Sequence, residues 1–322
     1  MTKKDWQQLG KGLAFLAPWI IGFAVFTALP IALSFWFSLC DYSLLQKPVY
    51  VGLENYRNLL WGQNTAGGYG DPWFWKSLWN TTRFALVFLP AGMIVSLGFA
   101  MLLNVQIKGQ SIYRTIIFLP SLVPAVASAM VWLWIYNADY KQGLINSYLY
   151  KFGESFPNLK ELLWQWGIKL DPIGFLAVKE WAMYALVFMS LWGVGNTVVI
   201  YLAGLQDVPK ELYEAAEIDG AGVWRRLWHV TIPMVSPVIF FNLIMGIIGS
   251  LQTFATPYIL TDGFGRPERS LYFFTMYLYD NAFRFLKMGH ASAMAWILLL
   301  IILIFTGIAF WTSKRWVHYQ GK

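Results

Sequence analysis

A short loop rich in carboxylates is the part of the sequence whose residue types and spacing could do chemistry. Glu211, Glu214 and Glu217 recur every third residue, so in a helix they share one face. Ala215 and Ala216 lie among them and leave room for another backbone to approach. Carboxylates in this arrangement can pair with basic groups of another polypeptide. They can equally face water on a solvated loop helix, and the residue types alone favour neither interpretation.

The flanking residues predict how this helix begins and ends. Asp207 is a suitable N-cap and Pro209 suits a first turn. Gly220 can end the helix in the left-handed conformation. We therefore expect two short helices in the loop that spans residues 206–233, the first of them carrying the acidic face.

No motif for catalysis or metal binding accompanies the acidic loop. The sequence has no Gly-x₄-Gly-Lys-Ser/Thr loop, no His-Glu-x-x-His pair and no Gly-x-Ser-x-Gly elbow. His229, His290 and His318 all fall near predicted membrane boundaries, where an interfacial position is the expected one. We predict no catalytic residue, no metal site and no cofactor bound by this chain.

Polar and small residues recur at helical spacing within otherwise apolar segments. Small residues such as Gly246 let membrane helices approach each other, so packing is one interpretation. Amides and an indole ring also suit the hydroxyls and faces of a sugar, so a solute pathway is the other. The candidate pathway residues are Trp192, Asn196, Asn242, Gly246, Ser250, Gln252 and Thr253.

Composition indicates an integral membrane protein. The chain is 57% hydrophobic and 13% charged, whereas about a quarter of the residues of a soluble domain are charged. Its 18 Trp and 17 Tyr suit two membrane–water interfaces. The net charge of +7 reflects Lys and Arg beside membrane helices, and no run of five basic residues indicates nucleic-acid binding. Cys40 is the single cysteine, so an intrachain disulfide is impossible.

Charge-free stretches predict an all-α, polytopic membrane protein. Lipid cannot pair with exposed backbone groups, so the spans are expected to be helices of roughly 20 residues. Pro18 falls near the start of the first span and Pro30 is expected to kink it. Leu271–Tyr279 is too short to span and is predicted to be an interfacial helix. Residues 1–322 are expected to form a single transmembrane domain with spans at about 13–39, 84–106, 115–137, 181–205, 233–257 and 289–312.

The distribution of basic residues predicts the orientation. With six spans, both termini lie on the same side of the membrane. Eleven of the 24 Lys and Arg residues fall in the short segments on that side, a higher density than in the long opposite loops. The positive-inside rule therefore places both termini and loop 206–233 in the cytoplasm.

The acidic loop also resembles a family motif. Glu214, Ala215, Ala216, Gly220 and Pro233 match the spacing of the EAA loop, EAA-x₃-G-x₉-I-x-L-P, of binding-protein-dependent ABC importer permeases. Val230 and Ile232 stand where that motif has Ile and Leu. Segments 41–56, 114–120 and 289–296 resemble the carbohydrate class of these permeases, which includes the maltose importers, whereas 60–80 and 150–175 show no such match.

The resemblance implies a type I ABC importer permease fold and a set of partners. The implied partners are a second, distinct permease, two ABC ATPase subunits that hold ATP and Mg²⁺, an extracytoplasmic solute-binding protein and membrane lipid, without nucleic acid. The location implied is the bacterial inner membrane. The residues expected to couple to the ATPase are Glu211, Glu214, Ala215, Ala216, Asp219, Gly220 and Pro233.

Two other functions remain to be weighed against a sugar importer subunit. A secondary carrier usually needs ionisable groups deep in its spans, and none is predicted here. A membrane-embedded glycosyltransferase would need acidic or metal-binding residues at a membrane face. The cargo itself stays open among neutral oligosaccharides, acidic uronate oligosaccharides and glycerol phosphates.

Overall fold

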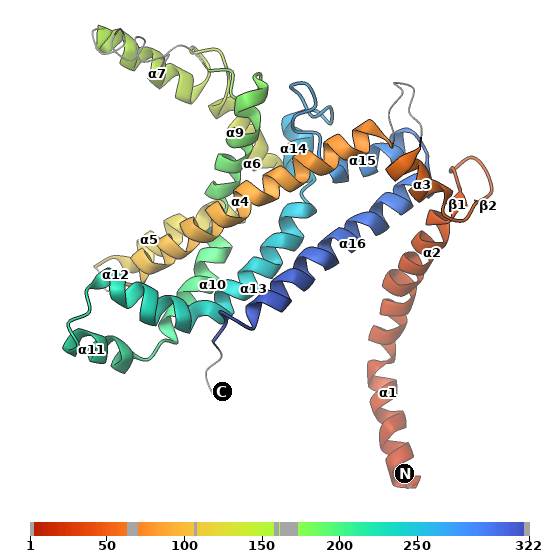
Figure 1. Ribbon diagram of the computed structural model, residues 1–322, viewed down its shortest axis with the longest axis horizontal. Helices are drawn as coiled ribbons and strands as arrows, with labels where there is room; N and C mark the ends of the chain where they lie inside the picture. The colour runs from red at the N-terminus through yellow and green to blue at the C-terminus, as the bar shows by residue number, and fades with distance from the viewer. Residues whose placement is uncertain (1–2, 63–69, 106–107, 158–160, 162–172, 319–322) are drawn as a thin grey trace. The chain divides into compact units, whose positions relative to one another are not determined.

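The computed structural model describes residues 3–62, 70–105, 108–157, 161 and 173–318, and these are predominantly helical, which confirms the all-α prediction (Figure 1). The chain divides into two compact units. The first contains residues 1–74 and 278–300, and the second contains residues 75–277 and 301–322.

The first unit begins with one long, interrupted helix. It consists of α1 (Lys3–Phe23), a π-helical turn η1 (Ala24–Ala28) and α2 (Leu29–Ser38). Pro18 lies well inside α1 and not near its start. The irregularity predicted at Pro30 takes the form of this π-turn, because the ring of a proline clashes with the carbonyl four residues earlier. The Leu29 amide donates to the carbonyl of Ala24, five residues back, and so widens the turn.

A short hairpin and helix fold back onto the end of α2. Strands β1 (Cys40–Asp41) and β2 (Val49–Tyr50) pair antiparallel, and α3 (Glu54–Trp61) follows. The Asn55 amide donates to the carbonyls of Ser38 and Cys40, both at 2.9 Å. One asparagine thus pairs carbonyls that the end of α2 leaves free, which gives a physical role to the Glu54-Asn55-Tyr56 segment.

The second unit carries most of the helices, and α4 and α16 run into it from the first unit. The remaining helices are given in chain order. They are α4 (Pro72–Asn104), α5 (Gln110–Phe118), η2 (Leu119–Leu122), α6 (Ala125–Ile135), α7 (Leu144–Ser155), α9 (Lys179–Trp192), α10 (Gly195–Gln206), α11 (Lys210–Ile218), α12 (Val223–Arg226), η3 (Leu227–Thr231), α13 (Ile232–Leu251), α14 (Ala255–Leu260), α15 (Phe274–Tyr279), η4 (Asp280–Arg284) and α16 (Met288–Ser313).

Two of the candidate spans are bent helix pairs. Among the described residues, four helices are long and apolar enough to cross a membrane, and up to six spans result if each bent pair is one span. Gln110–Leu122 and Ala125–Ile135 meet at 99°, and Lys179–Trp192 and Gly195–Gln206 meet at 50°. Each of the six predicted spans overlaps one of these helices or pairs, while the position of the bilayer along them stays a prediction.

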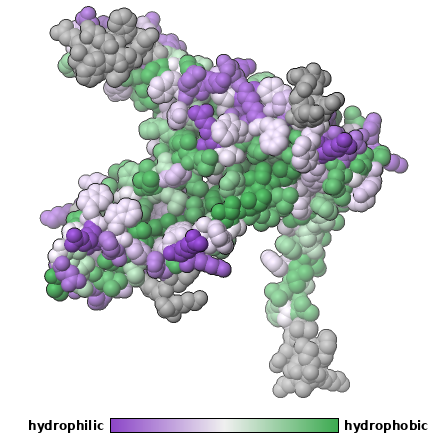
Figure 2. Space-filling model, viewed as in Figure 1, coloured by the Kyte–Doolittle hydropathy of each residue, from purple (hydrophilic) through white to green (hydrophobic). Residues whose placement is uncertain are grey.

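A cluster of buried hydrophobic residues in the second unit joins α10 to α4 and α13. Tyr201 is completely buried there, beside Val198, Leu205 and Val235. The helices approach closely at Gly204, where a Cβ atom would lie 2.6 Å from Cγ2 of Val238. Hydrophilic side chains gather over α11 and α12 and over the loop after α14 (Figure 2).

The helix predicted over Leu271–Tyr279 is present but shorter than predicted, and its first residues are buried within the protein. The helix begins at Phe274 and not at Leu271, and residues 271–274 are buried inside the second unit. The Asn80 amide donates to the carbonyls of Arg269 and Tyr272, and the Phe274 amide donates to Thr81 Oγ1 at 2.8 Å. These long-range contacts with α4 bury residues 271–274. The length and apolar composition of the segment, on which the prediction was based, give no information about such contacts.

Gly289 offers a test of the packing in the first unit. A Cβ atom there would collide with the carbonyl oxygen of Cys40 and lie 3.1 Å from the amide nitrogen of Tyr42. Because both atoms belong to the backbone, Gly289→Ala should destabilise the protein by about 1–3 kcal/mol. The measurement is the fraction of monodisperse protein that survives heating in detergent.

Gly307→Ala is the matched control, because it lies in the same helix and a Cβ atom there meets nothing within 4 Å. Equal melting temperatures for the two variants would contradict the packing described around Gly289.

Candidate functional site

The acidic helix predicted in loop 206–233 is present as α11. Its start differs from the prediction, because Asp207 caps the C-terminus of α10 and extended Pro209 occupies the N-cap position of α11. Its end agrees, since Gly220 has φ +73° and the Ala221 amide donates to the carbonyl of Ala216 at 2.8 Å. The left-handed glycine therefore ends α11 as predicted and lets the chain turn into α12.

Two side-chain contacts fasten α11 to the helix that leads into α13. Glu217 forms an ion pair with Arg226, at the end of α12. The Tyr213 hydroxyl lies 3.1 Å from Oγ1 of Thr231, the last residue of η3. These contacts attach α11 on one side, so the loop is a folded hairpin of helices. We call Glu217 with Arg226 and Tyr213 with Thr231 the brace.

The sequence does not predict the brace, because its residues come together only when the loop folds. Glu217 and Arg226 are nine residues apart, with a helix end and a turn between them. No helical or strand periodicity connects such positions, so only the folded loop brings them together. The pair removes Glu217 from the acidic face that the spacing of the three glutamates predicted.

The other predicted coupling residues face outward. Glu211, Glu214, Ala215 and Asp219 are exposed, and Ala216 is half-buried. In the described part of the chain, neither Glu211 nor Glu214 forms an ion pair. Large apolar side chains adjoin them, with Ile218 87% and Trp224 74% exposed. A surface of free carboxylates, small residues and exposed apolar groups has the composition of a protein-binding surface.

Pro233 connects this surface to a span. It follows the π-turn η3, in which the Ile232 amide donates to the carbonyl of Leu227, five residues back. The same relation holds between Leu29, Ala24 and Pro30. Through Pro233 the loop continues into α13 as one helical segment, and Val223–Leu260 together form a candidate span.

The predicted pathway residues do not form one cluster. Asn242 is buried, and its side-chain amide donates a hydrogen bond to the Val238 carbonyl in the same helix, at 3.0 Å. A Cβ atom at Gly246 would collide with Leu89, so both positions serve helix packing in this structure. Ser250 lines a small cavity of about 190 Å³ with Leu89 and Phe305.

The remaining pathway candidates are accessible. Asn196 and Gln252 are exposed, and Thr253 is half-buried, with its hydroxyl donating to the Gly249 carbonyl at 3.1 Å. Trp192 is 40% exposed at the break between α9 and α10.

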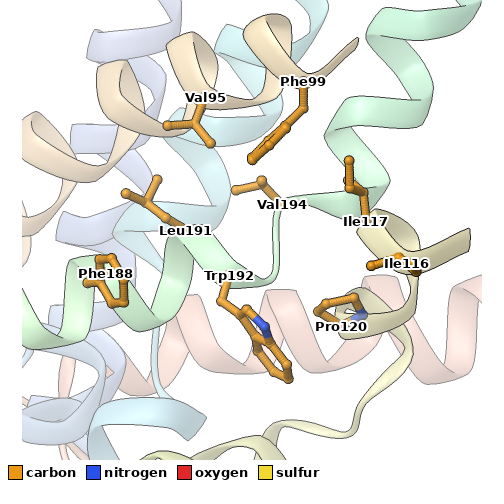
Figure 3. A pocket seen from close by; sticks show the side chains of 9 residues that line it. All are labelled: Val95, Phe99, Ile116, Ile117, Pro120, Phe188, Leu191, Trp192 and Val194. Atoms are coloured by element: carbon orange, nitrogen blue, oxygen red, sulfur yellow. The ribbon is translucent and has the colours of Figure 1, made fainter. Parts of the chain in front are cut away.

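Trp192 also lines a cavity between the two bent helix pairs (Figure 3). The cavity has a volume of about 400 Å³ and a predominantly apolar wall. Its lining residues come from α4, from the α5–η2 segment and from the end of α9: Val95, Phe99, Ile116, Ile117, Pro120, Phe188, Leu191, Trp192 and Val194. A wall of this composition can hold the apolar face of a ring but offers few hydrogen bonds.

Next to the cavity lies an aromatic cluster that the sequence did not predict. The Trp132 ring lies 5.7 Å from that of Phe188 and 6.0 Å from that of Trp192, centroid to centroid. Tyr136, one turn further along the chain, donates its hydroxyl to the Ala185 carbonyl at 2.9 Å and so ties α6 to α9. In the part of the chain that the structure describes, no group of three or more His, Cys, Asp or Glu residues could hold a metal ion.

Comparison with known proteins agrees with this arrangement. Residues 74–318 match the family described as binding-protein-dependent transport system inner membrane component. The probable ABC transporter permease protein YesP of Bacillus subtilis is 36% identical, over 97% of this chain and 93% of the relative. The lactose transport system permease protein LacF of Rhizobium radiobacter is 31% identical, over 94% of each chain.

A solved structure shares the fold. It belongs to a bacterial ABC transporter involved in the import of the acidic polysaccharide alginate, and it matches with a TM-score of 0.74 at 22% identity, over 97% of this chain and 98% of that one. The matched family, the polytopic helical fold and the outward-facing helix of the EAA loop lead to one conclusion. The chain belongs to the family of inner-membrane permease components of binding-protein-dependent ABC transporters.

Proposed function

We propose that this chain is one of two permease subunits of an ATP-driven sugar importer and that α11 is the element that couples it to an ATPase. The observation that carries the proposal is the attachment of α11. Glu211 and Glu214 are free to bind another polypeptide, while the brace, on an adjoining side of α11, holds the helix to the segment that enters α13. A displacement of α11 is therefore transmitted to a membrane helix.

Several relatives transport sugars according to their names, which supports the sugar assignment. They include the lactose permease and a trehalose/maltose transport system permease protein of Thermococcus litoralis, which is 32% identical over 81% of this chain. A sulfoquinovosyl glycerol permease of Agrobacterium fabrum is 29% identical over 94% of this chain. Trp192 and Asn196, exposed at the break between α9 and α10, are the residues we assign to the sugar route.

The rest of the assembly follows from this assignment. A second permease completes the pathway, two ATPase subunits hold ATP and Mg²⁺, and an extracytoplasmic binding protein delivers the sugar. Loop 206–233 and both termini lie in the cytoplasm, as the density of Lys and Arg indicates. Co-purification of this chain with a nucleotide-binding subunit distinguishes the proposal from a secondary carrier or a membrane-embedded glycosyltransferase.

The role of Glu214 can be tested by charge reversal. In the assembled importer, Glu214→Lys should lower sugar uptake at least about tenfold, because it replaces a charge-assisted contact with repulsion. The amount of protein in the membrane should not change, since Glu214 is exposed and makes no ion pair within the described chain.

Glu154→Lys on α7 is the matched control, because Glu154 is also an exposed helical glutamate but lies outside the loop. Normal uptake by Glu214→Lys, or equal losses of uptake in both variants, would contradict the coupling role of Glu214.

The brace can be tested by a charge swap. Arg226 is 24% exposed and Glu217 61%, so solvent screens the pair and its worth is about 0.5–1 kcal/mol. Glu217→Arg and Arg226→Glu should each lower the ATPase activity that loaded binding protein stimulates by about two- to fivefold. The double variant should recover most of the stimulation, and a double variant no better than either single one would show that the pair transmits nothing.

A further inference from the structure

One face of α9 carries a column of exposed aromatic side chains. Trp181, Tyr184, Phe188 and Trp192 follow one another at intervals of three or four residues, which places them along one side of the helix. All four are between 40% and 58% exposed. We call these four residues the aromatic column. It runs from the first turns of α9 to the break at Gly193, where Phe188 and Trp192 line the cavity of Figure 3.

A buried indole beside the column lacks an acceptor. Trp132 is 5% exposed, and its ring contacts Phe188 and Trp192. Its Nε1 atom is buried and has no hydrogen-bond partner among the described residues. A buried N–H without an acceptor is costly. Trp132 is not among the residues that line the cavity, so a ligand oxygen reaches this donor only when the neighbouring rings of Phe188 and Trp192 move apart.

A cation lies at the other end of the column. The Arg83 guanidinium on α4 lies 5.8 Å from the centroid of the Tyr184 ring, and its Nη2 is 3.5 Å from the Tyr184 hydroxyl. Arg83 is exposed, and no carboxylate of the described residues lies within 4.0 Å of it. Glu268, on the loop that contacts α4, is instead paired with Lys179 at 3.2 Å.

The surroundings make this arginine unusual. Residues 84–104, the rest of α4, contain no charged side chain. Arg83 is therefore a single cation at the edge of an apolar stretch, oriented by an aromatic ring that leaves part of its planar donor fork available. Such a fork binds a carboxylate through two parallel hydrogen bonds.

We propose that Arg83 and Tyr184 form a carboxylate-binding site at the extracytoplasmic end of the aromatic column, and that the cargo is an acidic oligosaccharide. Its pyranose rings stack on Phe188 and Trp192, and the Trp132 N–H donates to one of its hydroxyls. This inference rests on the proposed sugar import and extends it to the class of sugar. Stacking alone accepts any sugar, whereas Arg83 selects a negatively charged one.

The test compares a charged sugar with its neutral counterpart. The complete importer is reconstituted in proteoliposomes, and ATP-dependent uptake is measured for uronate trisaccharides and for the same trisaccharides after reduction of their carboxyl groups. The unaltered importer should prefer the acidic form of at least one of them. Arg83→Gln should lower that preference about tenfold, because one charge-assisted contact is lost, and should change neutral uptake less than twofold.

The comparison has an internal correction and a matched control. The same binding protein is used with every variant. Its own selectivity therefore affects the ratio of acidic to neutral uptake equally in all of them and cancels when the variants are compared. Lys141→Gln removes another exposed cation that lies over a tyrosine, 6.0 Å from the Tyr140 ring, and it should leave the preference unchanged. Arg83→Lys should retain part of the preference, since the charge remains but the fork is lost.

Other outcomes overturn the inference in recognisable ways. No preference in the unaltered importer, or an unchanged preference in Arg83→Gln, removes the carboxylate site. Equal losses of acidic and neutral uptake that anionic lipid restores would assign Arg83 to a lipid headgroup. If ATP-dependent uptake of neutral sugar persists in any of these cases, the proposed function stands. If no saccharide is taken up and no ATPase co-purifies, the proposed function fails, and the cargo assignment fails with it.

The indole donor has a test of its own. Trp132→Phe keeps an aromatic ring but removes the N–H, and it should lower kcat/KM for uptake about three- to tenfold, the loss of one neutral hydrogen bond. Trp134→Phe, on the same helix and 54% exposed, is the control and should change little. Equal values for the two variants would show that Trp132 is only a packing residue.

Discussion

A helix in hydrocarbon must pair its own backbone groups, and proline disturbs this pairing wherever it occurs. Pro30 and Pro233 are each preceded by a π-turn, in which the residue before the proline donates to a carbonyl five positions back. Around Pro120 and Pro124 the helix instead breaks completely and turns by 99°. Gly193 marks the other break, of 50°. The irregular positions of the spans are thus set by a few residues that cannot complete the ladder of hydrogen bonds.

These irregular positions coincide with the regions to which we assign function. The π-turn before Pro233 contains Thr231, whose hydroxyl lies 3.1 Å from that of Tyr213 on α11, so the widened turn is also the point at which α11 is attached. The break at Gly193 exposes Trp192 to a cavity whose other wall includes Pro120 of the second broken pair. A helix that has already lost backbone pairing at one point bends there more easily than elsewhere. We therefore assign the proposed coupling and passage to the points where the spans bend most easily.

The two surfaces of the second unit to which we assign binding differ in chemistry. Loop 206–233 presents carboxylates and exposed apolar side chains, which suits the basic groove of a protein. The aromatic column presents ring faces beside the Arg83 cation, which suits a saccharide that carries a carboxylate. Among the described residues, neither surface includes a group of three or more His, Cys, Asp or Glu side chains that could hold a metal ion. In the function that we propose, this subunit recognises and moves the cargo, and ATP hydrolysis takes place on another chain.

Composition and local sequence patterns were enough to predict the helical regions, the end of α11 and the family. Charge-free stretches predicted the six helical regions because a helix that crosses hydrocarbon needs about 20 mostly apolar residues in sequence, and that pattern is visible along the chain. Gly220 predicted its left-handed turn because a glycine adopts that conformation without steric cost. The spacing of Glu214, Ala215, Ala216 and Pro233 indicated the family.

Only the tertiary structure decided which polar residues pack and which remain accessible. Asn242 and Gly246 have the spacing of a pathway but are enclosed by neighbouring helices. Leu271–Phe274 read as an interfacial segment but are buried by contacts with Asn80 and Thr81, almost two hundred residues earlier. Glu217–Arg226 and Arg83–Tyr184 join side chains on different helices. Such pairs depend on how helices meet, and no periodicity within a single segment carries that information.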